Sequence, residues 1–296
     1  MAQNVTQLSA LSRLFSSSVL HEMAKKGCSP LFSRLFVQTG LSSSQRIDQG
    51  TVGEAFDAAF AVLRDSGLRN EYVYRAALTH NILLGRHSLN TSSMLTEFRT
   101  GSCKADLVIL NGTGTVYEIK SDRDSLARLD NQITNYRKVF AKIYVIAGER
   151  HIQEVVRRTT SDIGVMSLVR EGQIHTVREA IDRSGLVCPV TIFDSLRMAE
   201  ARAILQNLNE PIPEVPNTIL YAAMRECFSR LEPAEVHHQM VKILKKTRSL
   251  VAVGSLIDQL PAALQPAALS IKVRRSDHKR LLDAVRTPLN DAMAWA

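Results

Sequence analysis

The chain has few cysteines and no long apolar run, and each shortage argues against a class of protein. Its four cysteines are far apart in the sequence and form no Cys-x-x-Cys pair, which argues against a disulfide framework or a structural zinc site. No run of about 18 apolar residues occurs, and no apolar segment preceded by positive charge opens the chain. We therefore expect no membrane span, no secretory signal and a cytoplasmic location.

The composition is that of an ordinary globular protein with a basic balance. Hydrophobic residues make up 45% of the 296 residues and charged residues 22%, which is enough apolar material for a core. Lys and Arg outnumber Asp and Glu by 37 to 29, giving a net charge of +8. This excess favours a polyanionic partner such as DNA, although a merely basic soluble surface explains the charge equally well.

Composition shifts divide the chain into three predicted parts: a helical N-terminal segment (1–50), a core (51–208) and a helical C-terminal region (217–296). The motif Leu11-Ser-Arg-Leu-Phe15 returns as Phe32-Ser-Arg-Leu-Phe36, which predicts two short amphipathic helices. Three prolines between residues 210 and 216 predict an extended connector and a domain boundary. The basic helices expected after it are candidates for binding DNA or a partner protein, or for forming a homodimer; a solvated charged face is the alternative.

The spacing of apolar residues predicts an α/β order in the core: helices, three strands, a helix and a further strand. Helical spacing covers Thr51–Leu63, Tyr72–Leu84 and Asp122–Phe140, the last with Ser121 or Asp122 as N-cap. Short apolar or alternating runs predict strands at Met94–Arg99, Ala105–Leu110, Thr115–Lys120, Lys142–Ala147, Val165–Val169 and Ile174–Val177. Helical patterns return at Thr218–Leu231, Glu235–Arg248 and Asp277–Val285. Such an order implies a sheet layered with helices.

Three residues whose side chains could take part in catalysis or metal binding lie on one predicted hairpin. Glu118 and Lys120 stand two apart on a strand, so they share a face. A three-residue turn, Gly112-Thr-Gly114, with Gly114 at positive φ, would pair Asn111 with Thr115. That register places Asp106 opposite Lys120 and diagonal to Glu118, with all three on the same face.

Two carboxylates and a lysine form a set that suits a hard divalent cation. Oxygen ligands hold Mg²⁺ or Mn²⁺, so we expect Asp106 and Glu118 to bind such a metal. Lys120 would position or activate a water molecule, or stabilise developing negative charge. The alternative to a metal site is that the Glu and Lys side chains form a cross-face ion pair on a surface strand.

With its surroundings, this set resembles the PD-(D/E)XK nuclease superfamily, and the resemblance covers Thr51 to Glu149. It implies a restriction-endonuclease-like core with a mixed sheet flanked by helices, metal ligands at Asp106 and Glu118, and a catalytic lysine at Lys120. Gln132-x-x-x-Tyr136 is similar to the Gln-x-x-x-Tyr motif of the RecB-like branch, which implies that both side chains contact DNA beside the active site. Ala105 replaces the proline of the superfamily's name.

The stretch from Glu97 to Asp106, followed by Tyr117-Glu-Ile-Lys-Ser-Asp122, looks like a sparsely characterised family of bacterial and prophage-borne proteins within that superfamily. The resemblance implies a Mg²⁺- or Mn²⁺-dependent deoxyribonuclease, with phage defence or another mobile-element role.

An additional acid is expected at Glu97, with Glu71 as the other candidate. His80 and His87 are candidates for metal-adjacent positions, with capping or core roles as the alternative. The competing function is a catalytically silent or partner-dependent nucleic-acid-binding protein with the same fold.

Overall fold

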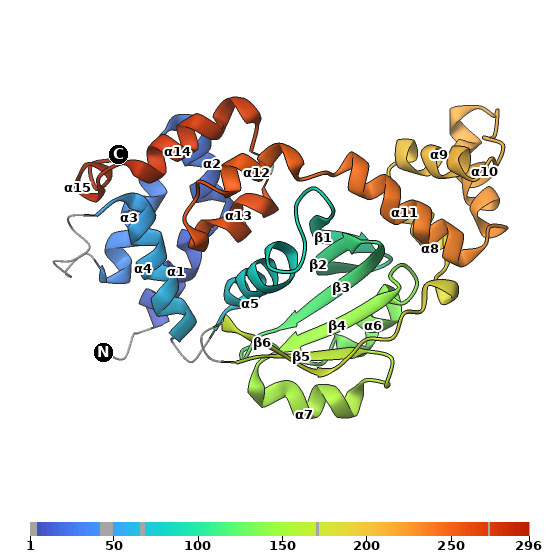
Figure 1. Cartoon of the computed structure of the whole chain (residues 1–296), viewed down its shortest axis with the longest axis horizontal. Helices are drawn as coiled ribbons and strands as arrows, with labels where there is room; N and C mark the ends of the chain where they lie inside the picture. Colours follow the sequence, from blue (N-terminus) through green and yellow to red (C-terminus); the bar gives the residue numbers. More distant parts are fainter. Residues whose placement is uncertain (1–4, 42–49, 66–68, 170–171, 272, 296) are drawn as a thin grey trace. The chain divides into compact units, whose positions relative to one another are not determined.

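The computed structural model describes residues 5–41, 50–65, 69–169, 172–271 and 273–295, and its elements are shown in Figure 1. The chain forms two compact units. Unit 1 contains residues 1–82, 170–173 and 250–296, and unit 2 contains residues 83–169 and 174–249. These units do not coincide with the segments 1–50, 51–208 and 217–296 predicted from composition. The proline-rich connector at 210–216 lies inside unit 2, because the helices on both sides of it pack together.

Unit 1 is helical. Aromatic rings fill its core: Phe15 stacks on Tyr72 with 4.5 Å between ring centroids, and Phe32 lies 5.0 Å from Phe56. The N-terminal segment forms three helices where two were expected. The helices are α1 (Val5–Leu14), α2 (Ser17–Lys26), α3 (Pro30–Thr39), α4 (Val52–Asp65), α5 (Glu71–Leu78), α12 (Gly254–Ile257), α13 (Gln265–Ser270), α14 (His278–Arg286) and α15 (Leu289–Ala292), with 3-10 turns η5 (Val251–Val253), η6 (Ala262–Leu264) and η7 (Arg275–Asp277).

Unit 2 is built on a six-stranded mixed sheet with the strands in sequence order, from β1 to β6. The strands are β1 (Ser93–Thr100), β2 (Cys103–Asn111), β3 (Thr113–Lys120), β4 (Lys142–Ala147), β5 (Gly164–Leu168) and β6 (Ile174–Arg178). The first three are antiparallel, β3, β4 and β5 are parallel, and β6 returns antiparallel. All six predicted strands are confirmed, and so is the general architecture of a mixed sheet flanked by helices.

The helices of unit 2 are α6 (Leu129–Tyr136), α7 (Glu149–Arg158), α8 (Pro189–Asp194), α9 (Met198–Asn207), α10 (Asn217–Ser229) and α11 (Pro233–Thr247), with a 3-10 turn η4 (Ser184–Leu186). A π-helix, η2 (Thr79–Leu84), leads the chain from unit 1 into unit 2. One buried cluster joins Val116 and Val145 of the sheet to Ile133 of α6, Val155 of α7 and Met240 of α11. Helices α6, α7 and α11 therefore cover the same face of the sheet, and α7 can be followed along it in Figure 1.

Helix α6 begins seven residues later than its predicted start at Asp122. The carboxylate of Asp124 accepts hydrogen bonds from the backbone nitrogen of Ser121 at 2.8 Å and from its hydroxyl at 2.7 Å. These bonds close a local turn that competes with the helix, as short polar side chains commonly do. The N-cap is Arg128, so the predicted caps at Ser121 and Asp122 are wrong.

Of the helices in the described part of the chain, none has the length and hydropathy that a bilayer crossing requires.

Candidate active site

Strand β3 places Glu118 and Lys120 on the face covered by α6, and both side chains are buried. Only 1% of the Glu118 side chain and 5% of the Lys120 side chain are exposed. The Lys120 Nζ lies 2.6 Å from Glu118 Oε1 and 2.9 Å from Gln132 Oε1 on α6. A buried ion pair of this kind requires further hydrogen bonds to offset the loss of hydration. Gln132 supplies one of them.

Tyr136 of α6 supplies the second contact to the buried carboxylate. Its hydroxyl donates to Glu118 Oε2 at 2.6 Å and also lies 2.9 Å from the backbone oxygen of Lys104. Burial, reinforced by the charge of Glu118, raises the pKa of Tyr136, so the phenol stays protonated and remains a donor. The spacing of four residues in Gln132-x-x-x-Tyr136 places both side chains on one face of α6, so both reach the same charge pair.

Asp106 lies on β2 beside this cluster. One of its carboxylate oxygens, Oδ2, accepts a hydrogen bond from the backbone nitrogen of Ile119 at 2.8 Å. The charge of Asp106 also contributes to the raised pKa of Tyr136, after burial and the larger effect of Glu118. The residue is half-buried, whereas Glu118 is fully buried. Asp106, Glu118 and Lys120 therefore gather around the same end of the hairpin.

The hairpin register differs from the prediction by two residues. Asn111 pairs with Thr113 rather than with Thr115, and Gly112, not Gly114, has the positive φ, at 70°. Continued past Leu107 and Tyr117, this register sets Asp106 opposite Glu118 instead of Lys120. A shift of two residues keeps every side chain on its face, so the predicted gathering survives the error.

Gly114 has a packing role instead. A Cβ atom at this position would lie 3.0 Å from the Nε2 atom of His237 on α11. The glycine therefore permits close approach of the helix to the hairpin, which a reading of turn types alone does not reveal.

Glu97, the favoured additional acid, lies on β1 in the position that faces Asp106, between the pairs Thr96 with Leu107 and Phe98 with Ala105. Its backbone adopts a left-handed conformation with φ of 53°, which is unusual for a glutamate within a strand. The side chain is 57% exposed and lies 3.6 Å from the Nζ of Lys104. The backbone of Glu97 is thus aligned with the carboxylates, but its side chain pairs with Lys104.

The other sequence candidates have separate partners. Glu71 belongs to unit 1 and forms an ion pair with Arg75 on the same helix. His80, also in unit 1, contacts Gln265 at 3.2 Å, and burial lowers its pKa. In unit 2, the ring of His87 lies 2.8 Å from the side-chain nitrogen of Asn111.

A divalent cation would find two carboxylates here. Within the described residues, no group of three or more His, Cys, Asp or Glu side chains is arranged to hold a metal. Mg²⁺ nevertheless keeps several waters and commonly takes one or two carboxylates in addition to substrate phosphates, so Asp106 and Glu118 suit it by chemistry. Both oxygens of Glu118 already accept hydrogen bonds, so a metal would have to replace or share at least one of them.

Comparison with known proteins decides the family. The model of a family described as bacteriophage P4 protein cII matches residues 64–253, which is more than half of the chain. The chain belongs to the bacteriophage P4 protein cII family. A curated relative, "Protein cII" of Enterobacteria phage P4, is 39% identical over 87 residues, which are 29% of this chain and 32% of that protein. The chain thus matches about a third of the length of this relative.

The match to the cII family contains all of the gathered residues, since Asp106, Glu118, Lys120, Gln132 and Tyr136 lie between residues 64 and 253. Among solved structures, a protein of unknown function from Silicibacter pomeroyi, SPO1766, aligns with 18% identity and a TM-score of 0.28. The alignment covers 43% of this chain and 86% of that protein.

Proposed function

We propose that this member of the cII family is a Mg²⁺- or Mn²⁺-dependent deoxyribonuclease with a PD-(D/E)XK-like core. One observation carries the proposal: a buried Lys120 is held between Glu118 and Gln132, and the Asp106 carboxylate on the neighbouring strand accepts a hydrogen bond from the backbone nitrogen of Ile119. Burying two charges costs several kcal/mol in desolvation for each ion, about 5 kcal/mol in order of magnitude, and hydrophobic residues would often fill such a space equally well. A chemical role accounts for their presence.

Asp106 and Glu118 would hold the metal, which when bound lowers the pKa of a water molecule and neutralises charge on the transferring phosphate. Gln132 orients the Lys120 ammonium through its side-chain oxygen. Tyr136 orients the Glu118 carboxylate and keeps its proton. Lys120 positions the attacking water or stabilises the negative charge that develops on the phosphate.

DNA is the proposed substrate, and the net charge of +8 supports a polyanionic one. The cytoplasm is the proposed location, since the substrate would be met there. Kinship with a phage protein supports a phage-related or mobile-element role, including phage defence. Gln132 and Tyr136 were expected to touch DNA directly. With both side chains turned toward the charge pair, we propose that they act on DNA through Lys120 and Glu118.

The test is a cleavage assay on the full chain with linear, circular and single-stranded DNA, with Mg²⁺, Mn²⁺ or a chelator. Asp106→Asn, Glu118→Gln and Lys120→Gln should each lower cleavage by at least about a hundredfold, the scale of a lost catalytic group. Glu226→Gln is the matched control, because that carboxylate is 63% exposed on α10. Cleavage that persists in all three site variants would refute the assignment.

A second function is favoured by one specific observation: both oxygens of Glu118 accept hydrogen bonds from the protein's own side chains. This arrangement fits a nucleic-acid-binding protein that is catalytically silent, or one that awaits a partner protein or dimerisation. Such a protein would retard DNA without metal and after Asp106→Asn, with an affinity that falls steeply as salt rises. Light scattering on the full chain would report whether it forms a homodimer.

A further inference from the structure

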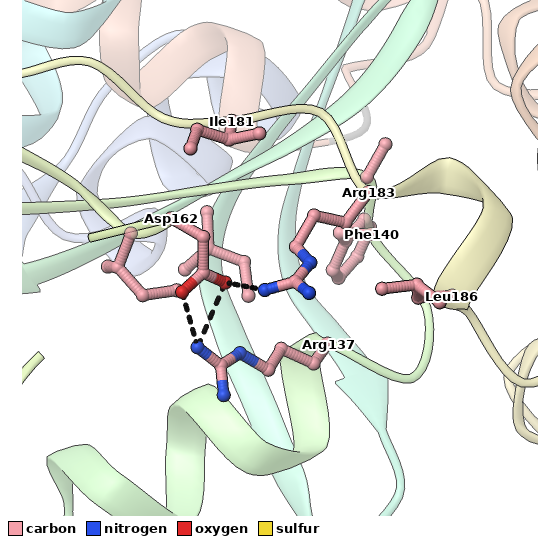
Figure 2. A pocket seen from close by; sticks show the side chains of 9 residues that line it. Arg137, Phe140, Asp162, Ile181, Arg183 and Leu186 are labelled. Carbon is pink, nitrogen blue, oxygen red and sulfur yellow. Dashed lines mark hydrogen bonds and ion pairs between the residues drawn. The ribbon is translucent and has the colours of Figure 1, made fainter. Parts of the chain in front are cut away.

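A hollow in unit 2 lies apart from the residues assigned to catalysis. It has a volume of about 180 Å³ and is bounded by the C-terminal end of α6, the starts of β4 and β5, and the segment after β6. Figure 2 shows its charged side chains, Arg137, Asp162 and Arg183, turned toward one another. Phe140, Ile143 and Ile163 form an apolar wall. The hollow therefore combines charged groups with an apolar surface.

Two arginines share one carboxylate in this hollow. Arg137 uses a single nitrogen, Nη2, at 2.8 Å and 2.9 Å from the two oxygens of Asp162. The Nη1 of Arg183 lies 3.1 Å from Asp162 Oδ2. Burial would raise the pKa of Asp162, but hydrogen bonds from Thr160 and Arg183 and the charge of Arg137 hold it below its usual value. The carboxylate is thus ionised, and the three groups together carry one net positive charge.

Neither guanidinium uses its paired nitrogens as a fork on Asp162. An arginine presents five N–H donors and binds a carboxylate best through two parallel bonds. In Figure 2, Arg137 and Arg183 each keep a terminal nitrogen that no dashed line reaches, and the side chains are 40% and 44% exposed. These two nitrogens, the Nη1 of Arg137 and the Nη2 of Arg183, make no hydrogen bond to any described residue. These two nitrogens could therefore donate hydrogen bonds to an anion bound in the hollow.

The rim of the hollow is apolar and open to solvent. Ile181 is 55% exposed and Leu186 is 66% exposed, and both line the hollow. A neighbouring hollow of about 460 Å³ shares both residues together with Asp162 and Arg183. Asp182 also lines that neighbour, where its carboxylate accepts a hydrogen bond from the backbone nitrogen of Ser184 at 3.0 Å. The rim therefore offers apolar contact next to the two guanidinium groups.

The size and the lining restrict what could bind. Sites for drug-sized ligands are typically about 300 Å³ or larger, so the part of the hollow beside Phe140, at about 180 Å³, accommodates a smaller group. A nucleic-acid backbone would leave the apolar wall without a partner. We propose that the hollow binds a small carboxylate that carries a branched aliphatic group, with the carboxylate on the outer nitrogens of Arg137 and Arg183 and the aliphatic group against Phe140 and Ile181. The same chemistry occurs in free short acids and at the C-terminus of a peptide that ends in leucine.

Isocaproate tests this site in the full chain, with methyl NMR signals of Ile143, Ile163 and Ile181 as the readout. Saturable shifts of these signals are expected. Isocaproamide has the same aliphatic body without the charge, and it should bind at least about tenfold more weakly because it loses a charge-assisted hydrogen bond. Acetate has the charge without the body, and it should also bind at least about tenfold more weakly because it buries no aliphatic group against the apolar wall. If isocaproamide binds the unaltered protein as tightly as isocaproate does, the proposed carboxylate site is wrong.

Variants and a second set of probes complete the test. Arg183→Gln should weaken isocaproate binding about tenfold. Arg225→Gln should leave it unchanged, because that arginine is exposed on α10 and pairs with Asp194. N-acetyl-Ala-Ala-Leu binding more tightly than isocaproate would identify a peptide C-terminus, and equal or weaker peptide binding would identify a free acid. Tighter binding of deoxyadenosine monophosphate at the same signals would contradict a carboxylate site. Because these measurements do not depend on DNA cleavage, the carboxylate site and the nuclease function can each be disproved without affecting the other.

Discussion

The buried pair of Glu118 and Lys120 leads us to expect opposite results from single and double replacements. Replacing one partner leaves the other charge in a space where only 1% or 5% of the side chain meets solvent. Glu118→Leu leaves Lys120 with Gln132 alone, and Lys120→Met leaves Glu118 with Tyr136 alone. Each single variant should therefore lose about 3–5 kcal/mol of unfolding free energy, as broken buried pairs do.

The double variant Glu118→Leu with Lys120→Met should recover that loss. It removes both charges and fills the space with side chains of similar volume, a change that is often neutral or stabilising by about 1–4 kcal/mol. The Tyr136 hydroxyl keeps an acceptor, because the backbone oxygen of Lys104 lies 2.9 Å away. Gln132 is half-buried and can turn to solvent. We expect a double variant within about 1 kcal/mol of the natural protein, or more stable, and without nuclease activity.

Chemical denaturation followed by circular dichroism would measure these differences. The exposed pair of Glu226 and Arg230 on and beside α10 is the matched control, since its side chains are 63% and 75% exposed. Replacing either of them should change the unfolding free energy by less than about 0.5 kcal/mol. A double variant at positions 118 and 120 that loses as much unfolding free energy as both single variants together would contradict this expectation. The pair would then be a structural requirement, and no chemical role would be needed to explain it.

Three further predictions concern other parts of unit 2. Tyr136→Phe should cost about 1.5–3 kcal/mol in denaturant unfolding, since it removes a hydrogen bond to a charged group, and should lower cleavage; unchanged values for both would contradict its orienting role. Gly101→Ala should destabilise the protein by about 2 kcal/mol and Gly112→Ala by about 1 kcal/mol, measured in the same way, because both glycines have positive φ but only a Cβ at Gly101 would clash with the Oδ1 atom of Asn135. Burial lowers the pKa of His237 from 6.5 to about 4, so the unfolded chain binds a proton first as pH falls, and stability should drop by about 3 kcal/mol between pH 6.5 and pH 4. The His237→Phe variant should not show this loss of unfolding free energy. If stability depends on pH in the same way in both proteins, His237 is not its cause.

The strands of the sheet were predictable because their signal is local. Alternating or apolar runs bounded by glycine and asparagine located all six strands to within about two residues, a typical boundary error. The same alternation placed Glu118 and Lys120 on one face. The proximity of Glu118 and Lys120 was therefore foreseeable from the sequence, and so was the position of Gln132 and Tyr136 on one face of a helix.

Features that depend on distant contacts were harder to predict. The role of Gly114 follows from its contact with His237 on α11, more than 120 residues later, so local turn rules assigned the positive φ to the wrong glycine. Helix α7 went unpredicted because its buried residues are only Ile152 and Val155, which leaves almost no apolar pattern. The hollow lined by Arg137, Asp162 and Arg183 is likewise assembled from three separate segments.

The division into units was missed for the same reason. Helix α4 packs against α1 at the start of the chain and against α14 near its end, so unit 1 is assembled from both ends. Composition along the chain reports linkers, and here the proline-rich segment connects helices of a single unit. The two ends of the chain, which composition places in separate segments, therefore belong to one compact unit.

Anomalous diffraction from crystals grown with Mn²⁺ would show whether Asp106 and Glu118 bind a metal together. We expect a manganese peak with carboxylate oxygens of Asp106 and Glu118 as ligands, and the loss of that peak in Asp106→Asn. A well-ordered hairpin in saturating Mn²⁺ with no peak beside these two carboxylates would contradict this expectation.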